Sequence, residues 1–409
     1  MFIFEHTFEV PLNYTEPEAE KISVFVRELR SDPEKRKPYL IFFQGGPGFE
    51  SPRPITNSGW IKCALERYDI LLLDQRGTGR STPVTIQTIG KWEPQKQANY
   101  LQHFRADNIV NDAEHIRQEL NDGEPWSILG QSFGGFCAVN YLSFHAHGLK
   151  EVMITGGIPP LSAHPDEIYR RTYKRVKLKN EAFFSIFPEA QKRACQIADH
   201  IQKTDPIFPD GDTLTVERFQ LLGLQLGFSD GYANLNYLFE HAFADRELSY
   251  AFLKGLTNLQ SFDTNPFFTI LHEACYAQKF STNWSANKIR DEFQEFDPKS
   301  RDPFLFTGEM LYPWMLDQFH SLTPLRDAAH FLAEKSDWPA LYHTDKLLKN
   351  SVPVAAAVYT HDMYVDRDYS METAESIQGI KVWETDEYEH NGLRSHGKNV
   401  LQNLFKLLD

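Results

Sequence analysis

Ser132 lies in the segment Gly130-Gln131-Ser132-Phe133-Gly134, between a short apolar run and an amphipathic segment. This order predicts a strand, a sharp turn and a helix, and the two glycines leave room where the chain doubles back. Such a turn exposes the serine at the carboxyl end of the strand, and the helix behind it points its amide groups at developing negative charge. The pattern favours a nucleophilic serine over a plain strand-to-helix turn.

A serine nucleophile needs a histidine base, and the histidine needs an acid that fixes its tautomer. After a nucleophile turn of this kind, the acid and then the histidine follow late strands of the sheet. Asp362 follows a late apolar run, and His390 lies a few residues after the last strand-like run. Asp366 is the alternative acid, and His396, expected at the start of the terminal helix, is the alternative base.

A glycine-rich loop, Gln44-Gly45-Gly46-Pro47-Gly48, directly follows the apolar run 39–43. Consecutive glycines let backbone amides approach a ligand closely, and a loop in this position supplies one donor of an oxyanion hole. Gly45 or Gly46 is therefore a candidate donor, together with the amide of Phe133. A glycine turn without any ligand is the alternative.

A second loop with a distinctive sequence, Asp74-Gln75-Arg76-Gly77-Thr78-Gly79-Arg80-Ser81, follows the apolar run 70–73. No Gly-Lys-Ser/Thr and no dinucleotide-binding spacing accompany its glycines, so the loop does not predict a phosphate site. We expect Asp74 and Arg76 to tie neighbouring loops together through charge-assisted hydrogen bonds.

The runs of apolar and β-branched residues predict the sheet that must hold these groups. An antiparallel pair is expected first, and runs that are apolar on both faces then predict central parallel strands, whose carboxyl ends gather the functional loops. The expected strands are 2–11, 21–29, 39–43, 70–73, 126–129, 151–155, 354–359 and 381–384, with covering helices at 104–120 and 397–408.

The middle of the chain has a different character. From about residue 161 to 345 the sequence is aromatic, charged and helical in pattern, as in 181–200 and 216–228, and it shows no alternation of strands with helices. Because this length is too great for a loop, we expect an inserted, mostly helical cap at 161–345. The α/β catalytic core, a mostly parallel sheet flanked by helices, then comprises residues 1–160 and 346–409.

The composition and the charge of the chain limit the kinds of molecule that it is expected to bind. The chain has 409 residues, with 42 basic and 56 acidic side chains and a net charge of −14, which argues against nucleic acid and is compatible with cationic substrates. No apolar run approaches the 18 residues of a membrane span, and residues 1–6 show no signal-peptide pattern, so we expect a cytoplasmic protein. The four cysteines lack metal-ligand spacing, which favours free thiols. Oligomeric state stays open.

Several motifs together resemble a known family, the prolyl aminopeptidases or proline iminopeptidases, which are serine peptidases of the α/β-hydrolase fold. The matching segments are Gly45–Gly48, Asp74–Ser81, Gly130–Gly135, Gly156–Pro160 and Glu387–Gly392. They span most of the expected core. One departure is a glutamine before the glycines of the first segment, where many α/β hydrolases have histidine, and this exchange does not remove a backbone donor.

The resemblance implies release of an N-terminal proline from short peptides, without metal or organic cofactor, under a helical cap. It also implies that acidic cap residues hold the free amine of the substrate, and Glu240 and Glu273 lie in the two segments similar to the family's amine-binding stretches. A cation taken into a closed pocket needs opposite charge. Glu309 is a third possibility. The alternatives are an esterase or another α/β hydrolase with the same core that acts on a small molecule, and a non-catalytic ligand receptor.

Overall fold

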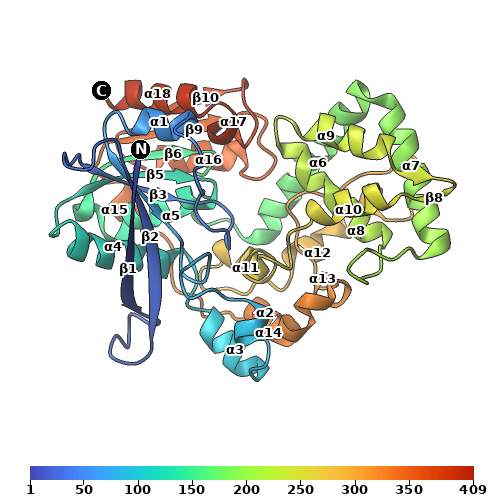
Figure 1. Cartoon of the computed structure of the whole chain (residues 1–409), viewed down its shortest axis with the longest axis horizontal. Coiled ribbons are helices and arrows are strands. Elements are labelled where there is room, and N and C mark those ends of the chain that lie inside the picture. The colour runs from blue at the N-terminus through green and yellow to red at the C-terminus, as the bar shows by residue number, and fades with distance from the viewer.

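The computed structural model describes residues 1–409 and is built on one eight-stranded sheet (Figure 1). The strand order is β1-β2-β4-β3-β5-β6-β9-β10, in which β1 pairs with β2 and β2 with β4 antiparallel, while the other pairs are parallel. The strands are β1 (Phe2–Pro11), β2 (Lys21–Arg30), β3 (Tyr39–Phe43), β4 (Asp69–Leu73), β5 (Trp126–Gln131), β6 (Leu149–Thr155), β9 (Val354–Tyr359) and β10 (Ile380–Thr385). The predicted α/β class with a mostly parallel sheet is confirmed.

Two apolar layers enclose the sheet. Every residue of β3, β4 and β9 is buried, as expected for strands covered on both faces. One face packs against α4 (Ala106–Leu120) and α5 (Phe133–Phe144), and the other against α1 (Gly59–Ala64) and α18 (Gly397–Leu408). The helix α5 differs from the expected amphipathic segment, because all but its last residue are buried.

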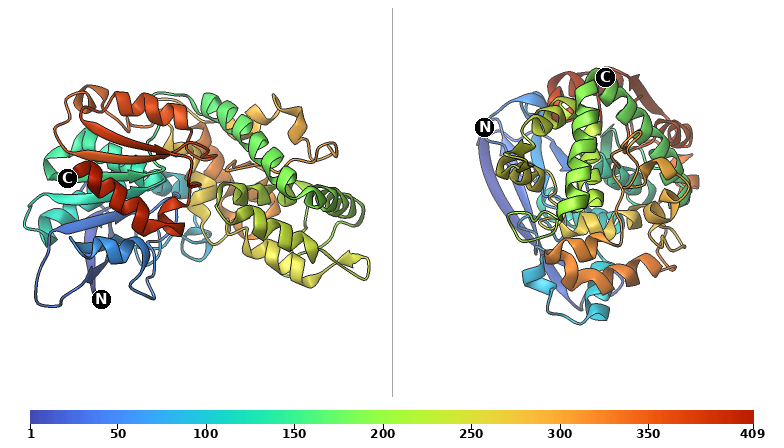
Figure 2. Two further views of the ribbon diagram at one scale, coloured as in Figure 1. Left: turned by 90° about the horizontal axis from the view of Figure 1, so that it is seen from above. Right: turned by 90° about the vertical axis from the view of Figure 1, so that its right-hand side faces the viewer.

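The chain between β6 and β9 contributes no strand to the large sheet and forms a helical region beside it (Figures 1 and 2). Its only strands are the short β7 (Phe243–Ala244) and β8 (Glu247–Leu248). The helices are α6 (Pro165–Ile186), α7 (Pro188–Thr204), α8 (Val216–Gln220), α9 (Gly231–Glu240), α10 (Tyr250–Asn258), α11 (Pro266–Leu271), α12 (Ser285–Arg290), α13 (Met315–Gln318), α14 (Arg326–Glu334) and α15 (Thr344–Leu347), with 3₁₀ turns η2 (Leu221–Gly227), η3 (Glu273–Cys275), η4 (Gln294–Phe296) and η5 (His320–Leu325). We call residues 161–345 the cap, and these limits stay a prediction.

Core and cap also contact each other at a place distant from the two segments that connect them along the chain, near residues 161 and 345. The helices α2 (Ile86–Ile89) and α3 (Pro94–Leu101) leave the core after β4, and α3 packs against α14 of the cap. Gln97 of α3 donates from its side chain to the carbonyl of Pro324, 3.1 Å away. The remaining helices, η1 (Ala146–Gly148), α16 (Arg367–Glu375) and α17 (Gly392–Ser395), lie between core strands or after the last one.

The loop Asp74–Ser81 ties the core together, as predicted. The guanidinium of Arg76 is buried and binds the carboxylate of Asp112 (Nε to Oδ2, 2.7 Å) and the carbonyls of Leu12 and His103 (2.8 Å each). Asp74 pairs with Arg53 at 2.6 Å. Both side chains are thus fully engaged in structure.

Two further findings concern the chain as a whole. None of the helices combines the length and the apolar character that crossing a bilayer requires. All four cysteines are free thiols, in agreement with the prediction, and Cys63, Cys137 and Cys275 are buried.

Candidate active site

Ser132 stands at the turn between β5 and α5 in a backbone conformation that non-glycine residues rarely adopt, with φ of 55° and ψ of −125°. The turn is held by its surroundings: the Ser132 amide donates to the carbonyl of Thr155 (3.0 Å). Glycines let the chain segments approach closely. A Cβ atom on Gly134 would lie 1.9 Å from the carbonyl oxygen of Phe43, and one on Gly157 would lie 2.2 Å from that of Ser132.

Asp362 and His390 meet at the carboxyl ends of β9 and β10. The Nδ1 atom of His390 lies 2.6 Å from Oδ2 of Asp362, and both side chains are buried. The other carboxylate oxygen of Asp362 accepts the backbone amides of Tyr364 (2.8 Å) and Val365 (3.1 Å). Since an ionised carboxylate only accepts, Nδ1 carries the proton and Nε2 of neutral His390 is left as the basic atom.

The two alternative residues are engaged elsewhere. Asp366 caps the start of α16 by accepting the amides of Asp368 and Tyr369, and it pairs with Arg171 at 3.0 Å. His396 is exposed at the start of α18, with its Nδ1 3.1 Å from the hydroxyl of Ser395. Neither residue lines the cavity that contains Ser132.

Core and cap together enclose a cavity of about 520 Å³, which we call the Ser132 cavity. This volume lies within the range of small-molecule sites. The core contributes Gln44, Gly45, Gly46, Phe49, Glu50, Pro52, Gln131, Ser132, Tyr364, His390 and Arg394, and the cap contributes Leu224, Gln225, Phe228, Leu259, Ser261, Phe268 and Glu309.

The glycine-rich loop after β3 borders Ser132. A Cβ atom on Gly45 would lie 2.9 Å from the Cβ of Ser132. The amides of Gly45 and Gly46 donate no hydrogen bond within the chain, and neither does the amide of Phe133 at the start of α5. Three backbone donors are therefore available around the nucleophile.

Glu309 is the acidic cap residue that reaches the Ser132 cavity. Burial, and then the negative charge of Asp362, raise the pKa of its carboxyl well above the usual range. The basic side chain paired with Glu309 is His272, whose Nε2 lies 3.4 Å from Oε2 of the carboxyl group. Burial lowers the pKa of His272 to about 3, so this ring is neutral and supplies no positive charge that would favour the ionised form of Glu309.

The structure does not bring Glu240 to the cavity. Glu240 ends α9 with 40% of its side chain exposed, accepts a hydrogen bond from Asn236 (3.0 Å) and lies 3.8 Å from Arg193. The expectation that aromatic neighbours turn it inward does not hold, because Phe239 takes the inward position and the next helical residue then faces outward.

Glu273 is buried but faces a helix rather than the Ser132 cavity. Its two carboxylate oxygens accept the amides of Ser285 (3.0 Å) and Ala286 (2.9 Å), which begin α12. Burial raises the pKa of its carboxyl to about 7. In this position Glu273 satisfies backbone donors that the first turn of a helix leaves unpaired.

Sequence reasoning missed the aromatic residues of the cavity wall. The ring of Tyr364 lies 4.5 Å from that of His390 and stacks on Phe228 of the cap at 5.7 Å, while its hydroxyl donates to the carbonyl of Leu224. Phe268 lines the cavity and stacks on His272 at 5.2 Å. The one available signal was the position of Tyr364, two residues after the expected acid.

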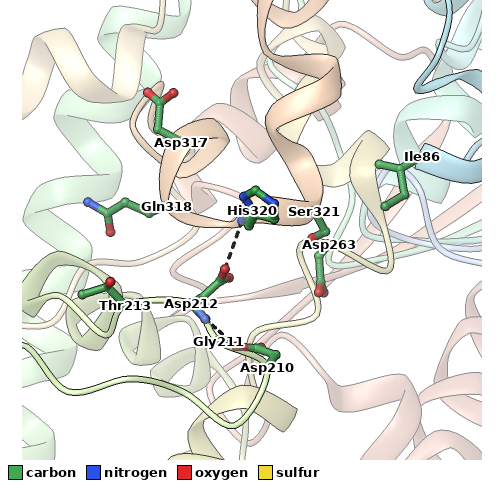
Figure 3. Close-up of a pocket in the computed structure, with 10 residues that line it drawn as sticks. All are labelled: Ile86, Asp210, Gly211, Asp212, Thr213, Asp263, Asp317, Gln318, His320 and Ser321. Atoms are coloured by element: carbon green, nitrogen blue, oxygen red, sulfur yellow. Dashed lines mark hydrogen bonds between the residues drawn. The ribbon is translucent and has the colours of Figure 1, made fainter.

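A second, larger hollow of about 750 Å³ lies in the cap and is separate from Ser132 (Figure 3). Four aspartates line it: Asp210, Asp212, Asp263 and Asp317. Asp212 is already bound, by the guanidinium of Arg218 at 3.0 Å and by the amide of His320 at 3.3 Å. Ser321 and His320 also line this hollow, but only the Ser132 cavity combines a serine at a strand-to-helix turn with a histidine bonded to a buried carboxylate.

Known proteins share the fold and much of the sequence of this chain. Residues 38–195 match the family model of the alpha/beta hydrolase fold. The proline iminopeptidase of Aeromonas sobria is 49% identical over 405 residues, which cover 98% of this chain and 95% of that enzyme. The chain belongs to the proline iminopeptidase family. A fungal member, proline iminopeptidase aneH of Aspergillus aculeatus, is 33% identical over 98% of this chain and 93% of its own length.

Membership of the proline iminopeptidase family confirms the resemblance that the motifs indicated. The relatives match the cap as well as the core, since both alignments cover 98% of the chain. The cap is thus a part of what this chain shares with proline iminopeptidases, whereas the fold model ends within α7.

Proposed function

We propose that this protein is a serine aminopeptidase that releases N-terminal proline from short peptides through an acyl-enzyme. The observation that carries the proposal is the presence of a largely buried carboxylate, Glu309, with 15% of its side chain exposed, in the same cavity as Ser132. A buried carboxylate without a cationic partner is costly unless a ligand supplies the charge. A free N-terminal amine, one residue from the bond to be cut, supplies it.

In the proposed reaction, the hydroxyl of Ser132 attacks the carbonyl carbon of the N-terminal proline while Nε2 of His390 takes the hydroxyl proton. Asp362 holds the His390 tautomer and stabilises the imidazolium that forms. Collapse of the tetrahedral intermediate breaks the C–N bond, and His390 gives its proton to the leaving amine. Water then attacks the prolyl ester, again through His390, and frees proline and Ser132.

The negative oxygen of both tetrahedral intermediates needs hydrogen-bond donors that are already in place. The free amides of Gly45, Gly46 and Phe133 border Ser132 and supply them in this proposal. Loss of one such donor in comparable enzymes costs about 10²–10³ in kcat, or about 3 kcal/mol.

Recognition of the N-terminal proline uses both the charge and the apolar wall of the cavity. Glu309 binds the secondary ammonium of proline, whose positive charge favours the ionised carboxylate that burial alone disfavours. His272 is neutral and therefore does not compete with the substrate ammonium for Glu309. Phe49, Phe228 and Phe268 offer apolar surface for the pyrrolidine ring.

The first test compares kcat/KM for a prolyl arylamide with that for the alanyl, leucyl and N-acetyl-prolyl arylamides and a simple aryl ester. We expect strong preference for the free prolyl amide and loss of activity on acetylation, which removes the charge that Glu309 binds. Ser132→Ala should abolish turnover without loss of fold. Ester cleavage without arylamide cleavage would instead indicate an esterase.

The amine site is tested by Glu309→Gln, with Glu240→Gln as the matched control in the exposed part of the cap. Glu309→Gln should lower kcat/KM for the prolyl arylamide by at least about 10-fold, because a charged partner is worth about 1.5–3 kcal/mol. Glu240→Gln should leave it unchanged. If Glu240→Gln or Glu273→Gln raises KM while Glu309→Gln does not, the amine lies elsewhere in the cap.

We also propose a cytoplasmic location. Four cysteines without a disulfide suit a reducing compartment. Activity in the cytosolic fraction of the native cells would support this, and activity confined to the medium or the cell envelope would contradict it.

A further inference from the structure

Arg394 is the only lysine or arginine among the residues that line the Ser132 cavity. It belongs to α17, the short helix that directly follows His390, so the chain places a permanent positive charge four residues from the proposed base. In a protein with a net charge of −14, a lone cation facing the active site needs an explanation.

The position of Arg394 is fixed from the cap side. Its guanidinium carbon lies 5.4 Å from the ring centroid of Phe228, within cation–π range. The next cap residue, Ser229, donates its amide to the side chain of Asn391 (3.1 Å), at the start of the same helix. Contacts from the cap and from the core therefore place Arg394 where the two parts border the Ser132 cavity.

Two of the carboxylates on the core side, near Arg394 and the base, are bound to other cations. Glu50, which lines the same cavity, pairs with Arg53 at 2.8 Å. Glu389, next to the base, binds the ammonium of Lys179 at 2.6 Å. No ion pair of the chain includes Arg394, so its guanidinium has its hydrogen-bond donors free for a ligand.

The cavity continues past Arg394 on the core side. A neighbouring hollow of about 260 Å³ shares Gln44, Pro52, Gln131 and Arg394 with the Ser132 cavity. It lies between the loop 52–61 and the start of α17. Arg394 thus stands where the two hollows join.

We propose that Arg394 binds the C-terminal carboxylate of the substrate and makes the enzyme selective for short peptides, with one or two residues after proline. The inference rests on the proposed function and extends it to the leaving group. A short peptide that starts with proline is a zwitterion, and the cavity offers Glu309 for its cationic end and Arg394 for its anionic end. Arginine suits a carboxylate because two parallel N–H groups match its two oxygens.

The test uses Pro-Gly and Pro-Gly-Gly, each as the free acid and as the C-terminal amide. For each enzyme variant, the measured quantity is the ratio of kcat/KM for the acid to that for the amide. This ratio cancels any general loss of activity or folded fraction. We expect a ratio above one in the wild type, and a fall of about three- to tenfold in Arg394→Gln. Arg394→Lys should keep an intermediate ratio, as a point charge without the fork.

Arg246→Gln is the matched control, since it removes one exposed positive charge in the turn between β7 and β8, at the far end of the cap (Figure 1). Its ratio should equal that of the wild type. An unchanged ratio in Arg394→Gln, or a wild-type ratio of one for both lengths, would overturn the inference while cleavage of the amides still supports the proposed function. Failure to cleave any prolyl peptide would count against the proposed function itself.

Discussion

Asp362 is held by more than its bond to His390, because its second oxygen accepts two backbone amides. Asp362→Asn should keep this loop in place but present an amide N–H to Nδ1, which forces the other tautomer of His390. We expect kcat for the prolyl arylamide to fall by about 10⁴-fold with near-normal thermal stability. Loss of only a few-fold would show that Asp362 is not the acid of the reaction.

Glu273 makes stability depend on pH. Its pKa is about 7 in the folded chain against an ordinary 4.5, so the folded state keeps a proton that the unfolded state releases. The free energy of unfolding should therefore fall as pH rises from about 4.5 to 7 and then stay level, by about 3 kcal/mol at most. Glu273→Gln should remove this component in denaturant titrations at pH 5 and pH 7.5. An equal pH dependence in wild type and variant would contradict the assignment.

The residues of the site differ in how far the sequence could reveal them. Ser132, Asp362 and His390 each lie within five residues of the end of a strand. The sheet therefore brings them to one edge, and this was predictable. Which cap carboxylate reaches the cavity depends on packing. The aromatic neighbours of Glu240 did not show which way its helix face turns, and Glu309 lies in a segment without helix or strand, just before Met310–Tyr312. Arg394 carried no signal, since nothing local separates it from a solvated helix residue.

At the scale of elements, the nucleophile turn depends on how closely β3, β5 and α5 approach. Gly134 leaves no room for a methyl group against the Phe43 carbonyl. Gly134→Ala should therefore push α5 away from β3, costing about 1–3 kcal/mol of stability and displacing the Phe133 amide. We expect kcat to fall more than the folded fraction. Gly379→Ala is a control for stability alone, because its added methyl meets nothing within 4 Å and only its positive φ of 78° strains alanine, far from the nucleophile turn.

The helices show where periodicity is informative. The helix 397–408 was predicted to the residue, because its apolar stripe faces the sheet continuously. In the cap, the apolar pattern of 181–200 crosses two helices that break at Phe187 and Pro188. Residues 221–227 form a 3₁₀ turn in place of a continued helix, and at its end Gly227 lies against the ring of Tyr364. Such breaks follow from tertiary contacts that the pattern does not contain.

One ion pair links the cap helix α6 to the loop of the base. Lys179 is buried, and Glu389 immediately precedes His390. Lys179→Met leaves the carboxylate without a partner, and we expect a loss of about 1–3 kcal/mol in stability together with lower kcat. Adding Glu389→Gln removes the orphan charge and should restore much of both. Independent, additive losses in the double variant would argue against a coupled pair.

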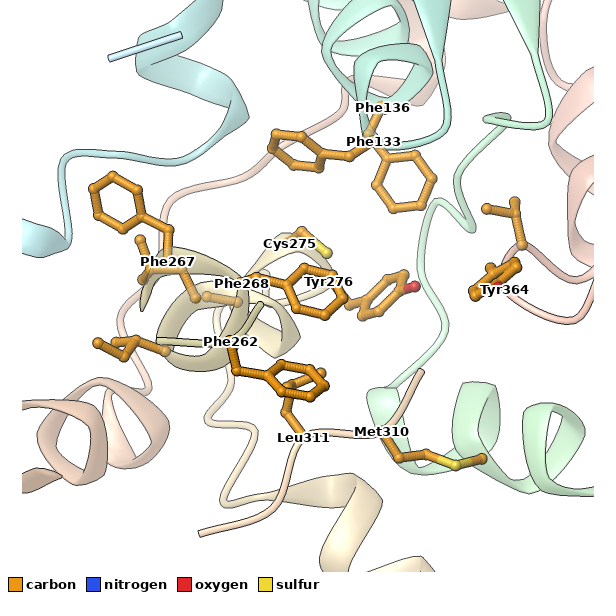
Figure 4. Close-up of a cluster of buried hydrophobic side chains, with 14 of the residues drawn as sticks. Phe133, Phe136, Phe262, Phe267, Phe268, Cys275, Tyr276, Met310, Leu311 and Tyr364 are labelled. Carbon is orange, nitrogen blue, oxygen red and sulfur yellow. The ribbon is translucent and has the colours of Figure 1, made fainter. Parts of the chain in front are cut away.

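At the scale of the molecule, one apolar cluster of 98 buried residues runs from the core through the cap. At the crossing, Phe136 of α5 lies 5.7 Å from Tyr276 of the cap (Figure 4). Phe104 likewise lies 5.1 Å from Phe267 of α11. Because neither part buries its apolar face alone, the two should unfold together. Calorimetry should give a single transition with equal calorimetric and van't Hoff enthalpies, and two resolved transitions would contradict this.

The cap is fastened at two distant places, by Lys179, Leu224 and Ser229 on the side of His390 and by Gln97 and Pro324 under α14. Because the cap is attached to the core at both places, we expect it to stay in position when a substrate binds. We therefore expect the N-terminus of a substrate to enter the Ser132 cavity as an extended chain between core and cap. A proline at the start of a folded protein then does not reach Ser132. The architecture thus suits short, unfolded peptides rather than folded proteins, in line with the proposed function.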